Sequence, residues 1–274
     1  SIISSNQFLN SRFRAIHIKS STNVSLINNS IHDNCGGVFI FDSSGIRITN
    51  NTINSNTYGI NVYNSNNLTI EYNKITNIQN NGIEAYGMEE SRIQYNVIED
   101  NGVSGIVLYT DSKNNSIMNN EIENNSVIGV YLSESGSNLV ASNTISGNKM
   151  GVKIHNATTE NEILNNNIYG SSSSGIFVDI SQNQRITSNI ITHNPYGIIL
   201  NYSNNILVEQ NIISNNSING INLYSTNNTL MTKNIFEYNT YYGVYMNSSE
   251  NNSVWFNDFI NNTAYDDLAN SFDN

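Results

Sequence analysis

Hydrophobic and polar residues alternate along this chain in short runs, and the same arrangement of runs returns every 22 to 24 residues. The clearest unit is a glycine followed by an apolar residue, any residue and a second apolar residue, as in Gly59–Val62 and Gly105–Leu108. Such alternation predicts half-buried strands, because a helix needs apolar residues at i, i+3, i+4 and i+7. The glycines that open these units are Gly37, Gly59, Gly82, Gly105, Gly129, Gly151, Gly175, Gly197, Gly220 and Gly243.

An asparagine column marks the same period independently. An apolar residue stands three positions before and two positions after each of these asparagines. We expect each side chain to donate to the neighbouring repeat on one side and to accept from the other, which satisfies a buried amide. A patchier second Asn column lies five residues further on, as at Asn34 and Asn56. The main column consists of Asn6, Asn29, Asn51, Asn73, Asn96, Asn120, Asn143, Asn166, Asn189, Asn211, Asn234 and Asn257.

The repeat length predicts a solenoid. Three short strands joined by turns of Asn, Ser and Gly fill about 23 residues, and one such repeat cannot bury its apolar face without stacked neighbours. We therefore predict an all-β parallel β-helix of about 11–12 coils, as a single domain over residues 1–274. The column glycine is expected at the corner entering a strand, where it either takes a positive φ or lets two backbones approach closely.

The order of these columns carries a family resemblance. Asn-x-Ile-x-x-Asn followed by Gly-Ile-x-Leu-x-x-Ser resembles the right-handed parallel β-helix repeats of NosD-like proteins and of the carbohydrate-binding and sugar-hydrolase β-helix group. It looks most like the repeats of large secreted and surface-layer proteins of archaea. The resemblance covers residues 1–274 and implies a right-handed solenoid. It implies little about activity, because the matching positions are structural and the group contains enzymes, binding modules and scaffolds.

Composition excludes several classes of function. Only 12% of residues are charged, and the net charge is −11. No basic patch is evident in the sequence, so nucleic acid is not an expected partner. No apolar run approaches the ~18 residues of a membrane span, so membrane insertion is not expected. The single cysteine, Cys35, excludes an internal disulfide.

Outward positions of the Gly-Ile-x-Leu strands form the candidate binding face. The position after the second apolar residue is aromatic in four consecutive repeats, and sugar rings pack against exposed aromatic faces. The alternative is that the rings cover one another, as cross-strand aromatic pairs do. The carbohydrate-binding candidates are Phe41, Tyr63, Tyr86 and Tyr109.

A polar group further along is the candidate catalytic cluster. Asp179 is expected one coil beyond His155 and would hold that ring in one tautomer, so that His155 can act as a general base. Lys153 or Tyr131 would stabilise a developing negative charge, and Glu134 lies nearby. A lyase or epimerase site usually gathers several Arg and Lys residues, and this cluster has one. We commit none of the five to catalysis.

Metal and modification sites are weaker candidates. Glu99, Asp100, Glu121 and Glu123 could hold Ca²⁺ through oxygen ligands, and the alternative is a solvated acidic edge. The NosD-like resemblance suggests copper, but the His, Cys and Met residues are scattered and form no cluster of soft ligands. We therefore expect no cofactor. The glycosylation candidates are the sequon residues Asn23, Asn67, Asn114, Asn156, Asn201, Asn227 and Asn247.

Repeats running to both ends of the chain suggest either a segment of a larger surface protein or pairing with other copies. We predict an extracellular structural or adhesive module of a cell-surface layer or filament. Its expected partners are other copies, in head-to-tail or lateral assembly, and a polysaccharide. The alternative is a polysaccharide lyase, uronate epimerase or glycoside hydrolase that uses the outward face of the Gly-Ile-x-Leu strands.

Overall fold

Strands of three to nine residues form the regular secondary structure of this protein in a computed structural model that describes residues 1–268 and 270–273. The chain divides into two compact units, Ser1–Leu139 and Val140–Asn274. The described residues form no helix, and hence none long and apolar enough to span a membrane. The predicted single domain over residues 1–274 stays a prediction.

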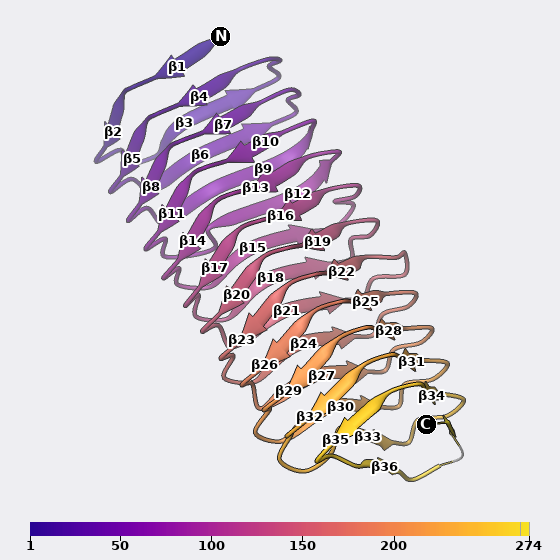
Figure 1. The fold of residues 1–274 in the computed structure, drawn as a ribbon. Coiled ribbons are helices and arrows are strands. Elements are labelled where there is room, and N and C mark those ends of the chain that lie inside the picture. The colour runs from indigo at the N-terminus through magenta and orange to yellow at the C-terminus, as the bar shows by residue number, and fades with distance from the viewer. Residues whose placement is uncertain (269, 274) are drawn as a thin grey trace. The chain divides into compact units, whose positions relative to one another are not determined.

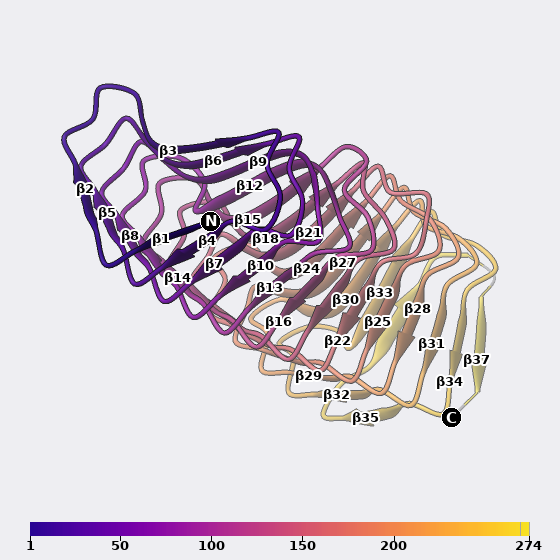
Figure 2. The ribbon, with the colours of Figure 1, turned by 90° about the horizontal axis from the view of Figure 1, so that it is seen from above.

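The first unit contains three parallel sheets, to each of which every coil adds one strand in turn (Figures 1 and 2). The first sheet consists of β1 (Ile2–Ser4), β4 (Ser25–Ile27), β7 (Arg47–Thr49), β10 (Thr69–Glu71), β13 (Arg92–Gln94) and β16 (Ser116–Met118). The second consists of β2 (Gln7–Leu9), β5 (Ser30–His32), β8 (Thr52–Asn54), β11 (Lys74–Thr76), β14 (Val97–Glu99) and β17 (Glu121–Glu123). The third consists of β3 (Arg14–Lys19), β6 (Gly36–Phe41), β9 (Tyr58–Asn66), β12 (Ile83–Glu89), β15 (Ser104–Tyr109) and β18 (Ile128–Ser133).

The second unit repeats this arrangement, and β19 (Leu139–Ala141) includes the boundary. Its first sheet consists of β22 (Glu162–Leu164), β25 (Arg185–Thr187), β28 (Leu207–Glu209), β31 (Leu230–Thr232), β34 (Ser253–Trp255) and β37 (Ser271–Asp273). Its second consists of β20 (Thr144–Ser146), β23 (Asn167–Tyr169), β26 (Ile190–Thr192), β29 (Ile212–Ser214), β32 (Ile235–Glu237) and β35 (Asp258–Ile260). Its third consists of β21 (Met150–His155), β24 (Ser174–Asp179), β27 (Tyr196–Asn201), β30 (Asn219–Tyr224), β33 (Val244–Asn247) and β36 (Ala264–Asp266).

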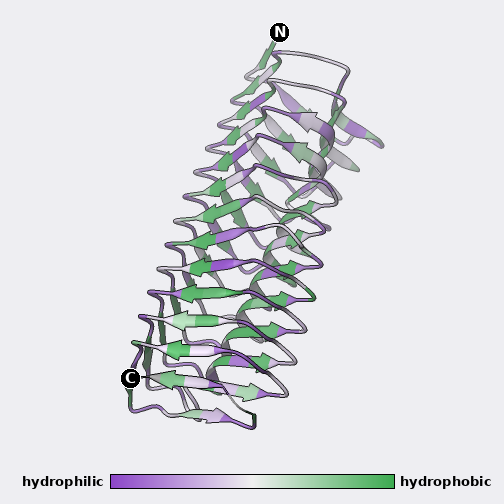
Figure 3. Cartoon of the chain, turned by 90° about the vertical axis from the view of Figure 1, so that its right-hand side faces the viewer, coloured by the Kyte–Doolittle hydropathy of each residue, from purple (hydrophilic) through white to green (hydrophobic). Residues whose placement is uncertain are grey.

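The apolar columns of the sequence form the interior of each unit. Ile48, Ile70 and Ile93 are paired in register in the first sheet and are fully buried. Hydrophobic and hydrophilic residues accordingly alternate along the strands (Figure 3). The all-β parallel solenoid of about 12 turns predicted from the sequence is confirmed.

The Asn column is an internal amide ladder, as predicted. Asn51 Nδ2 donates to Asn73 Oδ1 at 3.0 Å and to the Leu26 carbonyl of the preceding coil at 2.9 Å. Its own Oδ1 accepts from Asn29 Nδ2 at 3.0 Å. Asn189 makes the same contacts in the second unit, with Asn211 as its acceptor at 3.0 Å.

The column glycines serve close backbone approach, the second of the two expected roles. A Cβ on Gly105 would lie 2.7 Å from the carbonyl oxygen of Gly129 and 2.7 Å from Ile122 Cγ2. The positive φ falls instead on the residue before the ladder asparagine, such as Asn50 at 56° and Tyr72 at 57°. Asn and Ser fill many of these corners, because short polar side chains tolerate the left-handed region.

A hydroxyl ladder, which the sequence analysis did not identify, closes another corner. Ser43 N–H donates to Ser65 Oγ at 3.0 Å, and Ser181 N–H donates to Ser203 Oγ at 3.2 Å. The Ser that ends many of the Gly-Ile-x-Leu units, such as Ser43 and Ser65, was the signal that could have revealed it.

Candidate functional site

The outward face of the third sheet in the first unit carries the predicted aromatic column. Phe41, Tyr63, Tyr86 and Tyr109 are register partners on successive strands, as the repeat predicted. Ring centroids are 4.6 Å apart for Phe41 and Tyr63, 5.4 Å for Tyr63 and Tyr86, and 4.7 Å for Tyr86 and Tyr109. All three pairs are stacked, so neighbouring rings cover one another's faces. The edges and hydroxyls of this column are the parts left for a ligand, and sugar binding there stays a prediction.

The environment of the aromatic column also changes the acidity of its tyrosine phenols. Partial burial raises the pKa of Tyr63, Tyr86 and Tyr109 above the usual tyrosine value, and the Glu84 carboxylate raises each of them further. The phenols therefore remain protonated hydrogen-bond donors at neutral pH.

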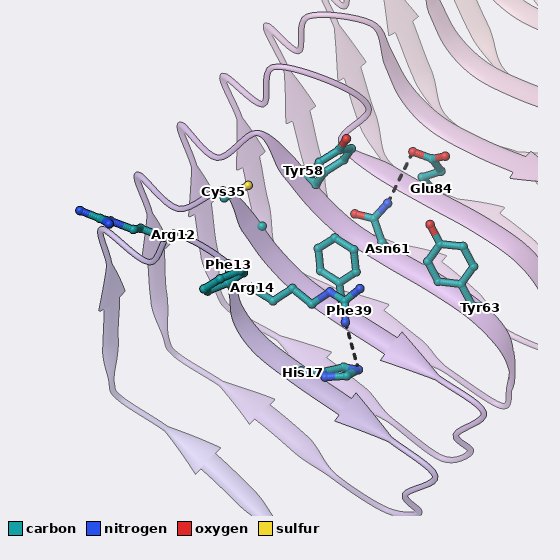
Figure 4. A pocket seen from close by; sticks show the side chains of 11 residues that line it. Arg12, Phe13, Arg14, His17, Cys35, Phe39, Tyr58, Asn61, Tyr63 and Glu84 are labelled. Atoms are coloured by element: carbon teal, nitrogen blue, oxygen red, sulfur yellow. Dashed lines mark hydrogen bonds between the residues drawn. The ribbon is translucent and has the colours of Figure 1, made fainter.

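Beside the aromatic column lies a groove of about 860 Å³ on strands β3, β6, β9 and β12 and on the segment that precedes β3 (Figure 4). Only Tyr63 of its lining had been singled out from the sequence. Several of the others occupy the x position of the Gly-Ile-x-Leu unit, the second outward position of each strand, and reading that position would have identified them. The lining consists of Arg12, Phe13, Arg14, His17, Cys35, Gly36, Phe39, Tyr58, Asn61, Tyr63 and Glu84.

Arg14 lies at the cationic end of this groove. Its guanidinium carbon is 4.6 Å from the ring centroid of Phe39 and 5.0 Å from that of Phe41. Its Nη1 lies 3.5 Å from Nε2 of His17, which accepts this long contact (Figure 4). Partial burial, followed by the charges of Arg14 and Lys19, lowers the pKa of His17, which favours the neutral form of its ring.

Asn61 and Glu84 form the polar part of the groove. Asn61 Nδ2 donates to Glu84 Oε2 at 3.5 Å (Figure 4). Asn81 Nδ2 donates to the same oxygen at 3.1 Å. Asn61 is only 3% exposed, and its Oδ1 accepts no hydrogen bond from the described residues. A buried acceptor without a donor is uncommon, because leaving it unpaired costs free energy.

The candidate catalytic residues fall in both units. In the second unit His155 and Asp179 are register partners, and Nδ1 of the histidine lies 3.0 Å from Oδ2 of the aspartate. Asp179 Oδ1 also accepts from Asn201 Nδ2 at 2.8 Å. Lys153 Nζ lies 5.5 Å from the ring centroid of Phe177.

Tyr131 and Glu134 belong to the first unit. Tyr131 meets Tyr109 edge to face at 5.9 Å, and Thr110 donates to Glu134 at 3.1 Å. The structure thus joins His155 to Asp179, as expected, and the catalytic roles of all five candidates stay predictions.

The acidic candidates do not gather round a common point. Glu99 and Glu123 are register partners, but Glu99 binds Lys74 Nζ at 3.0 Å, and Glu121 stands opposite Val97. Within residues 1–268 and 270–273, no three His, Cys, Asp or Glu side chains are arranged to hold a metal ion. The structure therefore adds no support for Ca²⁺ at Glu99, Asp100, Glu121 and Glu123.

The sequon asparagines fall into two groups by exposure. Asn23, Asn67, Asn114 and Asn156 are exposed and take positive φ at turns. Asn201, Asn227 and Asn247 are half-buried. The exposed group is the better placed for a glycan, and occupancy stays a prediction.

Comparison with known proteins identifies the fold family. The family model "Right handed beta helix region" matches residues 1–111 and 79–168, and the model "Periplasmic copper-binding protein (NosD)" matches residues 127–274. A comparison with curated protein sequences gives no match.

Solved structures with this fold include three proteins of different activity. The A-module of mannuronan C-5 epimerase AlgE6 from Azotobacter vinelandii superposes with a TM-score of 0.75 and 15% identity, over 100% of this chain and 89% of that one. PfbA, a surface adhesin of Streptococcus pneumoniae, gives 0.60 and 15% over 94% and 80%. Tailspike protein 2 of bacteriophage CBA120 gives 0.60 and 14% over 89% and 41%. At these identities the likeness shows the fold alone.

The copper named in the NosD description does not fit the donors in this chain. His32 Nδ1 lies 2.8 Å from Asp33, His155 contacts Asp179 and His17 contacts Arg14. None of these pairs belongs to a group of three or more His, Cys, Asp or Glu donors within the described residues. The two family models, each matching more than half of the chain, together with its coil-by-coil register, show that the protein belongs to the right-handed β-helix and NosD families.

Proposed function

We propose that this chain is a non-catalytic module of a secreted or surface protein that binds polysaccharide on the outward face of its first unit. The observation that carries the proposal is the groove of about 860 Å³, in which rings and polar side chains line the same hollow. Sites for small polar ligands combine apolar walls with a few polar groups in this way. The three β-helix neighbours, named as an epimerase, a tailspike and an adhesin, support a carbohydrate-related role.

The groove offers the contacts that a sugar needs. Phe13 is 80% exposed, and none of the ring contacts among the described residues includes it, so its faces are open to a pyranose ring. Tyr58 is 39% exposed on the same lining and presents a phenol for hydrogen bonding. Glu84 supplies carboxylate oxygens that accept from sugar hydroxyls.

A glycan array tests this function directly. Wild-type protein is expected to bind a subset of polysaccharides, and Phe13→Ala and Tyr58→Ala are each expected to weaken that signal about tenfold, because each removes an aromatic contact. Tyr95→Ala is the matched control, since Tyr95 is 45% exposed in the same unit but lies outside the groove. Absence of any glycan signal from folded wild-type protein would refute the proposal.

The proposal includes a location outside the cell and assembly with other copies into a layer or filament. A low proportion of charged residues and a strand register that repeats coil after coil support it. Electron microscopy of the purified chain tests assembly, since layers or fibres are expected and monodisperse particles would contradict it.

A polysaccharide-active enzyme is the second candidate, and the contact between His155 and Asp179 favours it. An aspartate that accepts from Nδ1 leaves Nε2 as the basic atom of the neutral ring, ready to accept a proton from a substrate. Uronate polymers incubated with wild type and with His155→Ala distinguish the candidates. Turnover lost in the variant would establish the enzyme, and no turnover on any polymer would eliminate it.

A further inference from the structure

Positive charge is concentrated at one end of the groove. Residues 1–32 contain Arg12, Arg14 and Lys19 and no Asp or Glu, whereas the whole chain carries −11. None of the ion pairs formed by residues 1–268 and 270–273 includes any of the three. An acidic protein thus keeps Arg12 and Arg14, two cations that no described ion pair neutralises, in the lining of this groove.

Arg14 packs against aromatic rings there. The faces of Phe39 and Phe41 lie 4.6 and 5.0 Å from its guanidinium carbon, and His17 lies beside Nη1. Gly36 leaves room for this arrangement, because a Cβ there would lie 2.6 Å from Phe39 Cε2 and 3.4 Å from Arg14 Cγ. A guanidinium packed on aromatic rings keeps the N–H groups of its edge free to bind an anion in a bidentate manner. Figure 4 shows Arg14 among the groove residues, while Arg12 extends away from them.

Two further features of the groove point independently to a ligand. Asn61 Oδ1 is a buried acceptor without a donor in the described structure, and a hydroxyl entering the groove would satisfy it. Phe13 exposes a large ring at the rim, where a sugar would cover it. Glu84 lies next to Asn61, so an anionic group is favoured at the Arg14 end and hydroxyls at the Glu84 end.

The geometry points to an anionic sugar residue, one carrying a carboxylate or a sulfate, bound in this groove with its anion on Arg14, an inference that rests on the polysaccharide binding proposed above. The anion accepts from the guanidinium edge of Arg14. The sugar ring packs on Phe13, and its hydroxyls face Asn61 and Glu84. The groove therefore selects acidic over neutral polysaccharide, although the protein itself is strongly acidic.

Calorimetric titration of the full chain with matched oligosaccharides tests this selectivity. The probes are an oligouronate, the same oligosaccharide with its carboxyl groups reduced to alcohols, and a sulfated oligosaccharide of equal length. We expect the charged probes to bind at least tenfold more tightly than the reduced one. This advantage should shrink as salt is raised, because ions screen an exposed pair. The ratio between the two charged probes identifies which anion is preferred.

Arg14→Gln is expected to weaken binding of the oligouronate by about ten- to a hundredfold, the value of a charge-assisted bidentate contact, and to leave the reduced probe unchanged. Arg92→Gln is the matched control, because Arg92 is an exposed arginine on β13 of the first sheet, and it should change affinity by no more than about twofold. Circular dichroism and the affinity for the reduced probe report whether each variant is folded.

The outcomes separate this inference from the function on which it rests. Equal binding of the charged and reduced probes, unaffected by Arg14→Gln, would overturn the anionic preference and leave polysaccharide binding standing. Binding of none of the probes, together with an empty glycan array, would overturn both.

Discussion

Two columns of outward side chains occupy equivalent positions on the third sheets of the two units. Their side chains contact those of the neighbouring coils in different ways. In the first unit the column from Phe41 to Tyr109 is a stack of rings. In the second unit the column of His155, Asp179 and Asn201 is a chain of hydrogen bonds at 3.0 and 2.8 Å. The backbone register is the same kind of parallel pairing in both.

The comparison teaches that the scaffold fixes where these side chains stand, while their identity determines the chemistry. In the first column the side chains are partly buried from water, and this burial raises the pKa of the phenols. Hydrogen bonding in the second column holds a partly exposed imidazole ring. A coil can therefore change its surface function by substitution at one position without any change of fold.

The largest expected effect comes from breaking the internal amide ladder, because the coils that carry both outward columns depend on it. Asn189→Ala in the second unit and Asn73→Ala in the first should each destabilise the surrounding coils by about 3 kcal/mol or more, since several buried donors and acceptors lose partners. Hydrogen exchange is the suitable measurement, because a repeat protein need not unfold in one step. If only one of the two variants lost protection in the unit that carries its substitution, the ladders of the two units would not be equivalent.

Repetition explains why the interior was predictable and the groove was not. The Asn and Ile columns recur in every coil, so one period gave the register, the buried ladders and the partnership of His155 with Asp179. The groove depends on residues that differ from coil to coil, such as His17, Phe39 and Asn61 at the x position, and on the side-chain conformation of Arg14. The spacing of the four aromatic residues left two alternatives open, ring faces exposed to a sugar or rings stacked on one another, and the structure shows stacking.

The next largest effect tests whether the aromatic column is structural. Tyr86→Ala removes two stacking contacts at once, with Tyr63 and with Tyr109, and should cost about 2–3 kcal/mol. Tyr95→Ala is the matched control. It loses one stack, with Tyr72 at 5.0 Å, on a corner where both rings are about half exposed, and should cost less than half as much. Local hydrogen exchange in β9, β12 and β15 reports the difference, and equal costs would contradict a structural role for the stack.

Alkaline titration sharpens the contrast in acidity. The pKa values of Tyr63, Tyr86 and Tyr109 are raised in the folded state, so the protonated phenols favour folding. Their contribution is complete below the usual tyrosine pKa of about 10 and is lost as pH rises through the higher folded-state values. An ultraviolet absorbance titration should show a late-ionising group of tyrosines. In Glu84→Gln this group should ionise earlier, because a negative charge has been removed. Ionisation of all tyrosines at the usual pH would contradict the burial of these phenols.

The smallest effect concerns the polar column. Asp179→Ala should change stability by less than about 1 kcal/mol, since the pair is partly solvated, but it should change the tautomer of His155. With Asp179 present, Nδ1–H is fixed as the donor, and nitrogen NMR shifts should report a basic Nε2. Without the aspartate the neutral ring should populate the Nε2–H form. Asn201→Ala is the control, because it leaves the His155 contact in place. Nitrogen shifts that do not respond to Asp179→Ala would show that the aspartate does not orient the His155 ring. The proposed proton-accepting role of His155 would then lose its physical basis.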